Sequence, residues 1–398
     1  MRTTTDILIS GGGVAGLTAA AAFGTAGFNV ICVEPTAPVT EATSPGADLR
    51  TTAFLTPAIA VLETAGLWER LKPHAAALQI MRIVDAGGKE QQPRYIKDFD
   101  AAELSNQPFG YNLPNWLLRR EMLTRLEELS NVTFRPGLAT VALLTRAETA
   151  LVTLSDHSQI EARLVIAADG RNSTMRQAAG IGVKTLRYGQ KALTFAVTHK
   201  IPHQNVSTEI HRSGGPFTLV PLPDLNGQPA SAVVWMERGP EALRLATLPD
   251  GAFEAEINAR SCHILGPLTL ASKRLVWPMI AQLAHRMASE RVALMAEAAH
   301  VVPPIGAQGL NMSLADLATL LDLAREKPAT LGSEAMLTAY HQRRHTEVTT
   351  RVLGIDALNR ASMVEAPILR DLRALGLNAL HGLAPIRRTL MRAGLGLR

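Results

Sequence analysis

The amino-acid sequence predicts an α/β fold of two interleaved domains followed by a C-terminal helical region. Three observations predict it. A Gly-rich turn joins an apolar strand to an Ala-rich helix at the start of the chain. Short strand-like segments dominate the middle, and a strand, a second Gly-rich turn and a helix return near residue 300. Two Gly-rich turns so far apart in the chain are expected to contact one long ligand from its two ends.

The composition is that of a globular protein and excludes several other classes. Hydrophobic residues make up 47% of the 398 residues and charged residues 19%. Aromatic residues are scarce at 4% and the formal charge is only +5, so no nucleic-acid-binding face is expected. Cys32 and Cys262 lie far apart, and no cluster has metal-ligand spacing, so we expect no disulfide, no metal and a cytoplasmic protein. No apolar run has the length of a membrane-spanning helix.

The first element is a strand–helix–strand unit. Ile7–Ser10 reads as a buried strand, Ala15–Ala26 as a helix and Asn29–Glu34 as a second strand. Gly11, Gly13 and Gly16 mark the turn from the first strand into the helix. Val14 and Ala15, between the second and third of these glycines, are candidate cofactor contacts as well. The first glycine allows a tight turn, the second admits a diphosphate to the backbone, and the third lets helix pack on strand. The unit therefore predicts a Rossmann-like dinucleotide-binding domain, with an ordinary Gly turn as the alternative.

Glu34 closes the second strand, 18 residues after Gly16. An acidic residue at this distance is placed to accept hydrogen bonds from an adenosine ribose.

The remaining elements follow from periodicity and turn residues. Helical spacing covers Ile59–Leu71 and Trp116–Leu129. The strand-like segments are Val141–Leu144, Ala150–Leu154, Leu164–Ala168, Leu193–His199, Phe217–Pro221, Ala232–Met236 and Arg291–Ala296. Helices return from Gly309 to residue 325 and over 333–398, with loops at Pro367 and Pro385. This order predicts a discontinuous cofactor domain over 1–75, 110–180 and 285–330. An inserted, mostly antiparallel substrate domain would cover 76–109 and 181–284, and 331–398 would form the helical region.

Asp169 and Gly170 directly follow the strand that ends at Ala168. The carboxylate would then lie at the edge of a parallel sheet where ligands bind. A helix N-cap by Asn172 or Ser173 is the alternative interpretation, and the two are compatible.

The segment around residue 300 predicts the other end of the ligand site. Glu297 is again an acid at a strand end and could bind the polyol linker of a flavin. The following turn would open a helix whose N-terminal dipole faces the flavin's pyrimidine edge, with these candidate contacts: Pro304, Gly306, Gln308, Gly309, Leu310 and Asn311. For His300 a structural role is favoured over an acid–base role.

Together these motifs resemble the aromatic-ring flavoprotein monooxygenases, which para-hydroxybenzoate hydroxylase typifies. Within that superfamily the chain most resembles the ubiquinone-biosynthesis hydroxylases, on the segments Asp48–Leu55, Leu62–Trp68, Ala298–His300 and Ile305–Asn311. The resemblance implies an FAD domain carrying a β-sheet substrate domain. It also implies that Arg50 contacts the flavin region and that Arg119 or Arg120, with Arg120 favoured, reaches the FAD diphosphate. Two departures are Ala296-Glu297, where Gly-Asp is usual, and Ser313, where Gly is common.

The activity that the resemblance implies is hydroxylation of a phenol ring. FAD reduced by NADH or NADPH would react with oxygen, and the substrate would be a polyprenylated phenol of ubiquinone biosynthesis. No residue declares itself as a catalytic base, so no catalytic residue is named. Three alternatives remain: a monooxygenase of a soluble aromatic compound, a flavin-dependent reductase of prenyl chains, and a non-catalytic FAD-holding scaffold.

The C-terminal region interleaves basic and apolar residues. The arginines are Arg370, Arg373, Arg387, Arg388, Arg392 and Arg398, and the leucines are Leu372, Leu375, Leu377, Leu380, Leu383 and Leu390. Basic amphipathic helices of this kind can lie on an anionic membrane, which would place the protein on the inner face of the cytoplasmic membrane. The alternative is a helix face that packs on the cofactor domain or on a partner, for which other ubiquinone-biosynthesis proteins are candidates.

Overall fold

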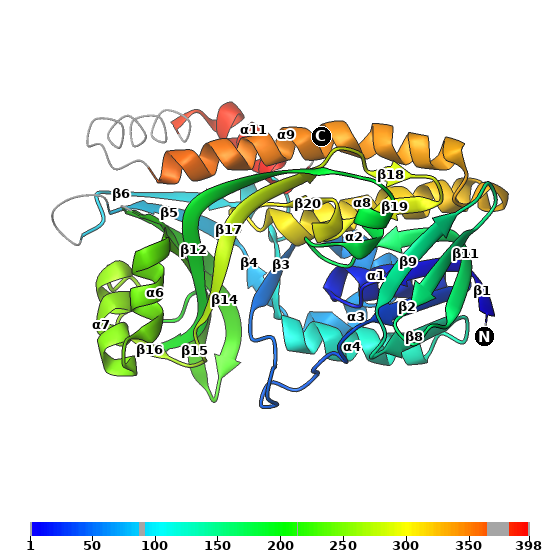
Figure 1. Ribbon diagram of the computed structural model, residues 1–398. Helices are drawn as coiled ribbons and strands as arrows, with labels where there is room; N and C mark the ends of the chain where they lie inside the picture. Colours follow the sequence, from blue (N-terminus) through cyan, green and yellow to red (C-terminus); the bar gives the residue numbers. More distant parts are fainter. Residues whose placement is uncertain (1, 87–91, 213, 364–381, 397–398) are drawn as a thin grey trace.

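The computed structural model describes residues 2–86, 92–212, 214–363 and 382–396. Two large β-sheets lie side by side, with helices around the first and a small third sheet between them (Figure 1). The α/β fold predicted from the sequence is thereby confirmed. Among the described helices, none is long and apolar enough to cross a membrane.

The first sheet is built around the strand–helix–strand unit at the N-terminus. Its strand order is β18-β19-β11-β1-β2-β8, with β10 and β9 added next to β11. The central strands β19, β11, β1, β2 and β8 run parallel. The bounds are β1 (Arg2–Ser10), β2 (Val30–Glu34), β8 (Val132–Pro136), β9 (Thr140–Thr145), β10 (Ala150–Leu154), β11 (Gln159–Ala167), β18 (Ala288–Ser289) and β19 (Val292–Leu294). Because Ile7, Leu8 and Ile9 are fully buried, β1 forms the centre of the core.

The second sheet is mostly antiparallel, in the order β20-β17-β12-β15-β14-β13-β5-β6, with β16 beside β12. The bounds are β5 (Ile80–Asp85), β6 (Tyr95–Asp100), β12 (Val183–His199), β13 (Val206–Arg212), β14 (Gly215–Leu225), β15 (Gln228–Arg238), β16 (Leu268–Leu270), β17 (Leu275–Ala284) and β20 (His300–Val301). Helices α6 (Gly239–Thr247) and α7 (Asp250–Arg260) pack on the face that carries Phe195 and Trp235. Since side chains alternate along strands, Ala192 and Met236 point from the opposite face, toward the first sheet.

The small sheet and the other helices connect these two layers. The small sheet contains β3 (Thr51–Leu55), β4 (Ala76–Leu78) and β7 (Gly110–Pro114). The helices are α1 (Val14–Thr25), α2 (Thr56–Thr64), α3 (Trp68–Leu71), α4 (Asn115–Glu127), α5 (Thr174–Ala178), α8 (Gln308–Glu326), α9 (Glu334–Ser362) and α11 (Ala384–Leu395), with short 3-10 turns at Lys72–His74, Ala101–Glu103, Ala296–Ala298 and Pro328–Thr330. Helices α9 and α11 lie along the top of the molecule (Figure 1).

Two local predictions were wrong, and two helices were not predicted. The helix predicted over Ile59–Leu71 is two helices, because Gly66 adopts a left-handed conformation (φ 70°) between α2 and α3. Pro385 lies in the first turn of α11 instead of a loop, since proline is favourable there. Helices α6 and α7 were not predicted from the sequence. The loop predicted at Pro367 lies outside the described residues, and the division into domains stays a prediction.

Candidate cofactor and substrate site

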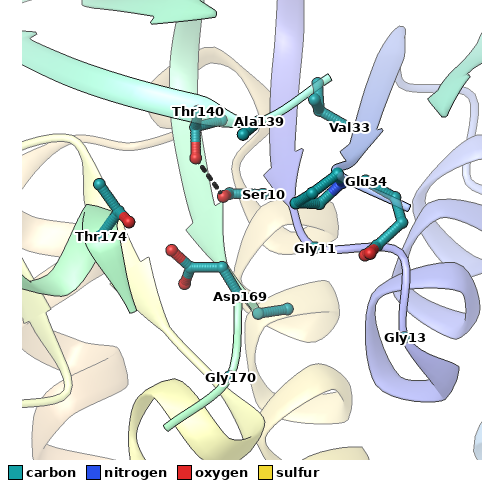
Figure 2. Close-up of a pocket in the computed structure, with 12 residues that line it drawn as sticks. Ser10, Gly11, Gly13, Val33, Glu34, Ala139, Thr140, Asp169, Gly170 and Thr174 are labelled. Atoms are coloured by element: carbon teal, nitrogen blue, oxygen red, sulfur yellow. Dashed lines mark hydrogen bonds between the residues drawn. The ribbon is translucent and has the colours of Figure 1, made fainter. Parts of the chain in front are cut away.

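A cavity of about 330 Å³ lies at the carboxyl ends of β1, β2 and β11 (Figure 2). It is lined by Ser10, Gly11, Gly13, Val33, Glu34, Pro35, Ala139, Thr140, Ala168, Asp169, Gly170 and Thr174. The structure therefore brings together Glu34 and Asp169, which are 135 positions apart in the chain (169 minus 34). This is the sheet edge at which ligands bind in parallel α/β folds.

The glycines at this edge differ in what surrounds them. A Cβ atom on Gly11 would lie 2.3 Å from the Ala168 carbonyl oxygen, and one on Gly16 would lie 1.8 Å from that of Gly11. Both positions therefore need glycine for close backbone packing. A Cβ atom on Gly13 would meet no described atom within 4 Å, because it would point into open space at the cavity.

Helix α1 begins beside this space. No side chain among the described residues caps its N-terminus at Gly13, and its first turn, with Val14 and Ala15, holds no acidic residue. The free N–H groups and the positive end of the helix dipole therefore face the cavity, as an anion such as a diphosphate requires.

Glu34 holds the glycine turn in place from the neighbouring strand. Its carboxylate accepts hydrogen bonds from the backbone N–H groups of Gly12 at 2.5 Å and Thr36 at 3.3 Å. Both carboxylate oxygens keep further acceptor capacity toward the cavity. Binding of a ribose by Glu34 stays a prediction.

Asp169 fixes the start of α5. It accepts hydrogen bonds from the Ser173 hydroxyl at 2.5 Å and the Met175 N–H at 3.1 Å, and Ser173 is the N-cap of α5, accepting from the N–H of Arg176. The capping interpretation is thus confirmed for Ser173, and Asp169 lines the cavity as well (Figure 2).

Glu297 is paired with a residue that the sequence reading did not assign. Arg171 donates from Nε and Nη2 to the two Glu297 carboxylate oxygens, at 3.1 and 3.3 Å. The partners are 126 positions apart, so no local pattern could have revealed the pair. The Glu297 side chain remains half exposed. If Glu297 also binds a flavin polyol, as predicted, its carboxylate would have to accept hydrogen bonds from the polyol and from Arg171 at the same time.

Ala296 adopts a left-handed conformation (φ 55°) immediately before Glu297. A non-glycine residue costs about 1–2 kcal/mol in this region. Ala296→Gly removes that strain but adds freedom to the unfolded chain, so we expect a net stabilisation of about 0.5–1 kcal/mol. Urea unfolding of the variant and the parent protein measures it. Unchanged or lower stability would mean that the turn is not strained at this position.

The second Gly-rich segment forms a turn over residues 303–308, which we call the cofactor turn. Gly306 (φ 61°) and Ala307 (φ 56°) are both left-handed, and α8 begins at Gln308 with no side-chain cap among the described residues. Gly309 and Leu310 follow in its first turn, so their N–H groups have no partner within the helix. The turn and the helix N-terminus thus present backbone donors, as predicted for the flavin's pyrimidine edge.

The Asn311 side chain makes contacts within the protein that were not predicted. Its amide nitrogen donates to the carbonyls of Ala53 at 2.8 Å and Ala307 at 2.6 Å, and its oxygen accepts from the Leu55 N–H at 2.8 Å. The amide therefore ties β3 to the start of α8, with both N–H donors used and one acceptor position left on its oxygen. The predicted contact of Asn311 with a flavin stays a prediction.

Arg50 lies in a charged network at the end of β3. Its guanidinium donates to both Asp48 oxygens at 2.7 Å and stacks on the Trp277 ring at 4.4 Å. Asp48 also accepts from Asn115 at 3.1 Å and from Arg119 at 3.4 Å. Arg119, and not the favoured Arg120, thus faces Arg50.

Arg120 points away from this network. It donates to Glu121 at 2.9 Å and lies over the Trp116 ring at 5.4 Å. The spacing along α4 could have distinguished Arg119 from Arg120. Arg119 shares one face of the helix with three buried residues, Asn115, Met122 and Leu126, and therefore lies on the side of α4 that faces inward.

The Asp48 network predicts a pH-dependent stability. Burial alone would raise the pKa of the Asp48 carboxyl, but the hydrogen bonds and charges of Arg50, with Asn115 and Arg119, hold the pKa below its usual value. A lowered pKa in the folded state stabilises the protein above the unfolded pKa of about 3.9, and that contribution is lost as the pH falls through the folded pKa. We expect Asp48→Asn to lose about 1.5–3 kcal/mol at neutral pH.

Urea unfolding across the pH range tests this expectation. The difference between Asp48→Asn and the parent should begin to narrow below a pH of about 4, where the Asp48 carboxyl of the unfolded chain takes up a proton, and should keep narrowing until the folded carboxylate is also protonated at lower pH. A difference that stays constant with pH would contradict an electrostatic origin.

An apolar surface faces the cofactor turn from the second sheet. We call it the apolar wall; its members are Tyr188, Ala192, Val234, Met236, Trp277 and Met279, with Ile305 of the cofactor turn packed against them. Tyr188 carries its only titratable group, and the hydroxyl donates to Asp356 at 2.8 Å. Burial and the hydrogen bond to the Asp356 carboxylate raise the pKa of Tyr188. The wall is therefore apolar, with Ala192, Met236 and Met279 buried and Tyr188, Val234 and Trp277 partly buried, and it holds no ionised side chain.

Behind the cofactor turn lies a buried polar cluster. His300 Nε2 is 2.6 Å from one Asp316 oxygen, and Arg344 Nε donates to the other at 2.8 Å. All three side chains are buried, with His300 on β20, Asp316 on α8 and Arg344 on α9. These contacts support the structural role favoured for His300.

Comparison with known proteins agrees with this geometry. The model of the FAD binding domain family matches residues 4–353. Ubiquinone hydroxylase UbiL of Rhodospirillum rubrum is 33% identical over 394 residues, covering 98% of this chain and 89% of the relative. The 3-demethoxyubiquinol 3-hydroxylase of Escherichia coli is 28% identical over 399 residues, covering 99% of each chain. The crystal structure of p-nitrophenol 4-monooxygenase PnpA from Pseudomonas putida has the same fold, with a TM-score of 0.80 over 100% of both chains at 18% identity.

The matched family covers the cavity at Gly13, the Arg50 network and the cofactor turn, and the relatives align over nearly the whole chain. The chain therefore belongs to the FAD binding domain family and is an FAD-dependent aromatic hydroxylase related to the ubiquinone hydroxylases.

Proposed function

We propose that this enzyme hydroxylates the ring of a polyprenylated phenol in ubiquinone biosynthesis. The observation that carries the proposal is the apolar wall opposite the cofactor turn, which suits an uncharged ring with apolar substituents. Two relatives aligned over nearly the whole chain are named for hydroxylation of ubiquinone or its demethoxy precursor, which supports the same substrate class.

The residues present fit FAD. Gly13 leaves open the space that a side chain would fill, and the uncapped N-terminus of α1 points there. Arg119 adds a buried Nε atom without a hydrogen-bond partner among the described residues, which a diphosphate oxygen would satisfy. We assign the diphosphate contact to Arg119 in preference to Arg120 on this ground. The flavin ring would be held by Arg50 and the cofactor turn.

The chemistry that FAD supplies when bound, and reduced by NADH or NADPH, is the activation of molecular oxygen. The protein's own part is to bind, orient and enclose. The apolar wall would hold the phenol ring and exclude water, while Arg50 and Trp277 stack at its border. No ionised side chain among the described residues of the wall offers a base, and Tyr188, with its raised pKa, keeps its proton.

Deletion of the gene in its host, followed by mass spectrometry of the lipid extract, tests the proposal. We expect loss of ubiquinone and accumulation of a prenylated phenol lacking one oxygen, which also identifies the ring position. An unchanged quinone pool in a host without a redundant hydroxylase would overturn it and leave a monooxygenase of a soluble aromatic compound. Substrate-dependent oxygen consumption by the purified protein separates a hydroxylase from a prenyl reductase or a non-catalytic scaffold.

We also propose that α11 contacts an anionic lipid surface. Its N-cap Leu383 and the helix residues Ile386 and Leu390 are exposed on one side, at 55%, 40% and 44%, and Arg388 and Arg392 are exposed on another side of the helix. A short helix that exposes both apolar side chains and arginines suits the interface of a bilayer with anionic headgroups. Arg387 has a different role, since it pairs with Glu103. The predicted Arg370, Arg373 and Arg398 lie outside the described residues.

Vesicle co-sedimentation measures this contact. We expect the protein to bind phosphatidylglycerol vesicles at least about tenfold more tightly than phosphatidylcholine vesicles, because each arginine near the surface contributes about 1 kcal/mol. Leu383→Ser/Leu390→Ser should weaken binding to both. Leu144→Ser, which alters an exposed leucine on β9, is the matched control. Equal binding to both lipids, or to neither, would contradict the proposal.

A further inference from the structure

One buried side chain connects the cofactor turn to the C-terminal helix. The Gln308 amide nitrogen donates to the carbonyl of Gly306 at 2.8 Å and to that of Gly394, in α11, at 2.9 Å. A primary amide has two N–H donors, so both are used. Its oxygen accepts from Arg351 Nη1 at 2.8 Å, and the side chain is only 8% exposed. The orientation of Gln308 is thus fixed jointly by the turn, by α11 and by α9.

Arg351 extends this connection along α9. Its Nε donates to Glu347 at 3.2 Å, and Glu347 accepts from Arg344 at 2.7 Å. Arg344 in turn pairs with the buried Asp316. The end of α11 also lies against Arg351, since a Cβ atom on Gly396 would come within 2.6 Å of Nη2. The polar chain therefore runs from α11 through Gln308 and Arg351 to the cluster behind the cofactor turn.

A second cavity, of about 280 Å³, lies beside this chain. Its walls come from α2, α8, α9 and the end of α11, and among its lining residues are Gln308, Arg351, Leu395 and Gly396. Because a cavity adjoins the C-terminal end of α11, the contact of that end with α8 and α9 depends mainly on these hydrogen bonds, while buried Met391 and the Arg387–Glu103 pair hold the rest of the helix. A displacement of α11 would meet little steric resistance there and would act directly on the Gln308 amide.

We propose that Gln308 and Arg351 are positioning residues that attach α11 to the cofactor turn, so that contact of α11 with an anionic bilayer alters the turn around the flavin. The exposed leucines and arginines of α11 supply the lipid contact, and the Gly394–Gln308–Gly306 hydrogen bonds carry the change inward. This inference rests on the lipid contact and on the FAD site proposed above. It requires that lipid bind more tightly when α11 is displaced from the cofactor turn than when it is in the position described here.

The test compares Arg351→Met with Arg343→Met in the FAD-loaded enzyme. Arg343 stands on the same helix, half exposed, and pairs with Glu326 at 3.7 Å instead of with Gln308. The readout is the visible circular dichroism of the bound flavin, before and after addition of phosphatidylglycerol vesicles. Vesicle binding and FAD content are measured in the same samples.

We expect the flavin dichroism of the parent and of Arg343→Met to change on vesicle binding. In Arg351→Met the change should be at least twofold smaller at equal vesicle binding, and the lipid-free spectrum should already differ from that of the parent. Vesicle binding with an unchanged flavin spectrum, or an Arg351→Met response equal to that of Arg343→Met, would overturn the inference while leaving the lipid contact in place. Absence of vesicle binding would overturn both the inference and the lipid contact. Hydroxylation retained in that case would show that the proposed reaction does not depend on them.

Discussion

Gly13→Asp is expected to weaken FAD binding by at least about 100-fold, or about 2.7 kcal/mol, without unfolding the protein. The new side chain would enter the open space at the cavity and bring a negative charge to the position proposed for the diphosphate. The backbone of Gly13 (φ −69°, ψ 177°) suits any residue, and aspartate is a favourable N-cap for α1. The apoprotein should therefore be as stable as the parent or slightly more stable.

Fluorescence titration of the apoprotein with FAD measures the affinity, and urea unfolding the stability. Gly251→Asp is the matched control, because Gly251 is exposed in the first turn of α7 and a Cβ atom there meets no described atom within 4 Å. That variant should bind FAD normally. Normal binding by Gly13→Asp would mean that the diphosphate does not lie against this turn.

Asp316→Asn is expected to cost about 3 kcal/mol of stability, because breaking a buried ion pair leaves its partner uncompensated. Asp316 is fully buried between His300 and Arg344, and no solvent can replace its charge. Loss of this carboxylate would loosen β20 and α9 from α8 directly behind the cofactor turn. Urea unfolding at one fixed FAD concentration measures the effect.

Arg344→Met and the double variant complete the test. If the two residues act as a pair, the double variant should lose less stability than the sum of the single variants. Glu326→Gln breaks the exposed pair with Arg343 and should stay within about 0.5 kcal/mol of the parent. Additive losses would indicate that Asp316 and Arg344 stabilise the fold through separate contacts.

The parts of the fold that the sequence predicted are those held by local patterns. The strand–helix–strand unit follows from apolar runs and glycines within the first 34 residues, and α8 follows from helical spacing. The break at Gly66 escaped because the apolar spacing continues across it while the backbone turns left-handed. Periodicity reports which face of an element is apolar, and not whether the element is continuous.

The sequence predicted the backbone features of the site better than it predicted which side chains pair with one another. Glycine turns and uncapped helix starts are written in short segments, whereas the pairs Arg171–Glu297 and Asp316–Arg344 depend on how distant segments pack. Asn311 illustrates the difference: its place at the start of α8 was predicted, but its amide binds β3 from more than 250 positions away. Only the packed structure shows which polar groups are already satisfied.

The cavity at Gly11 and Gly13 offers its ligand chiefly backbone groups and empty space. Such a surface imposes steric conditions at a few glycines and almost none on the identity of neighbouring side chains. A lineage can therefore exchange most of its side chains around this cavity while the backbone that forms it is retained, and the fold is shared with a protein of only 18% identity. Divergence would then be free to act on the opposite sheet, where we propose that the apolar wall meets the substrate ring.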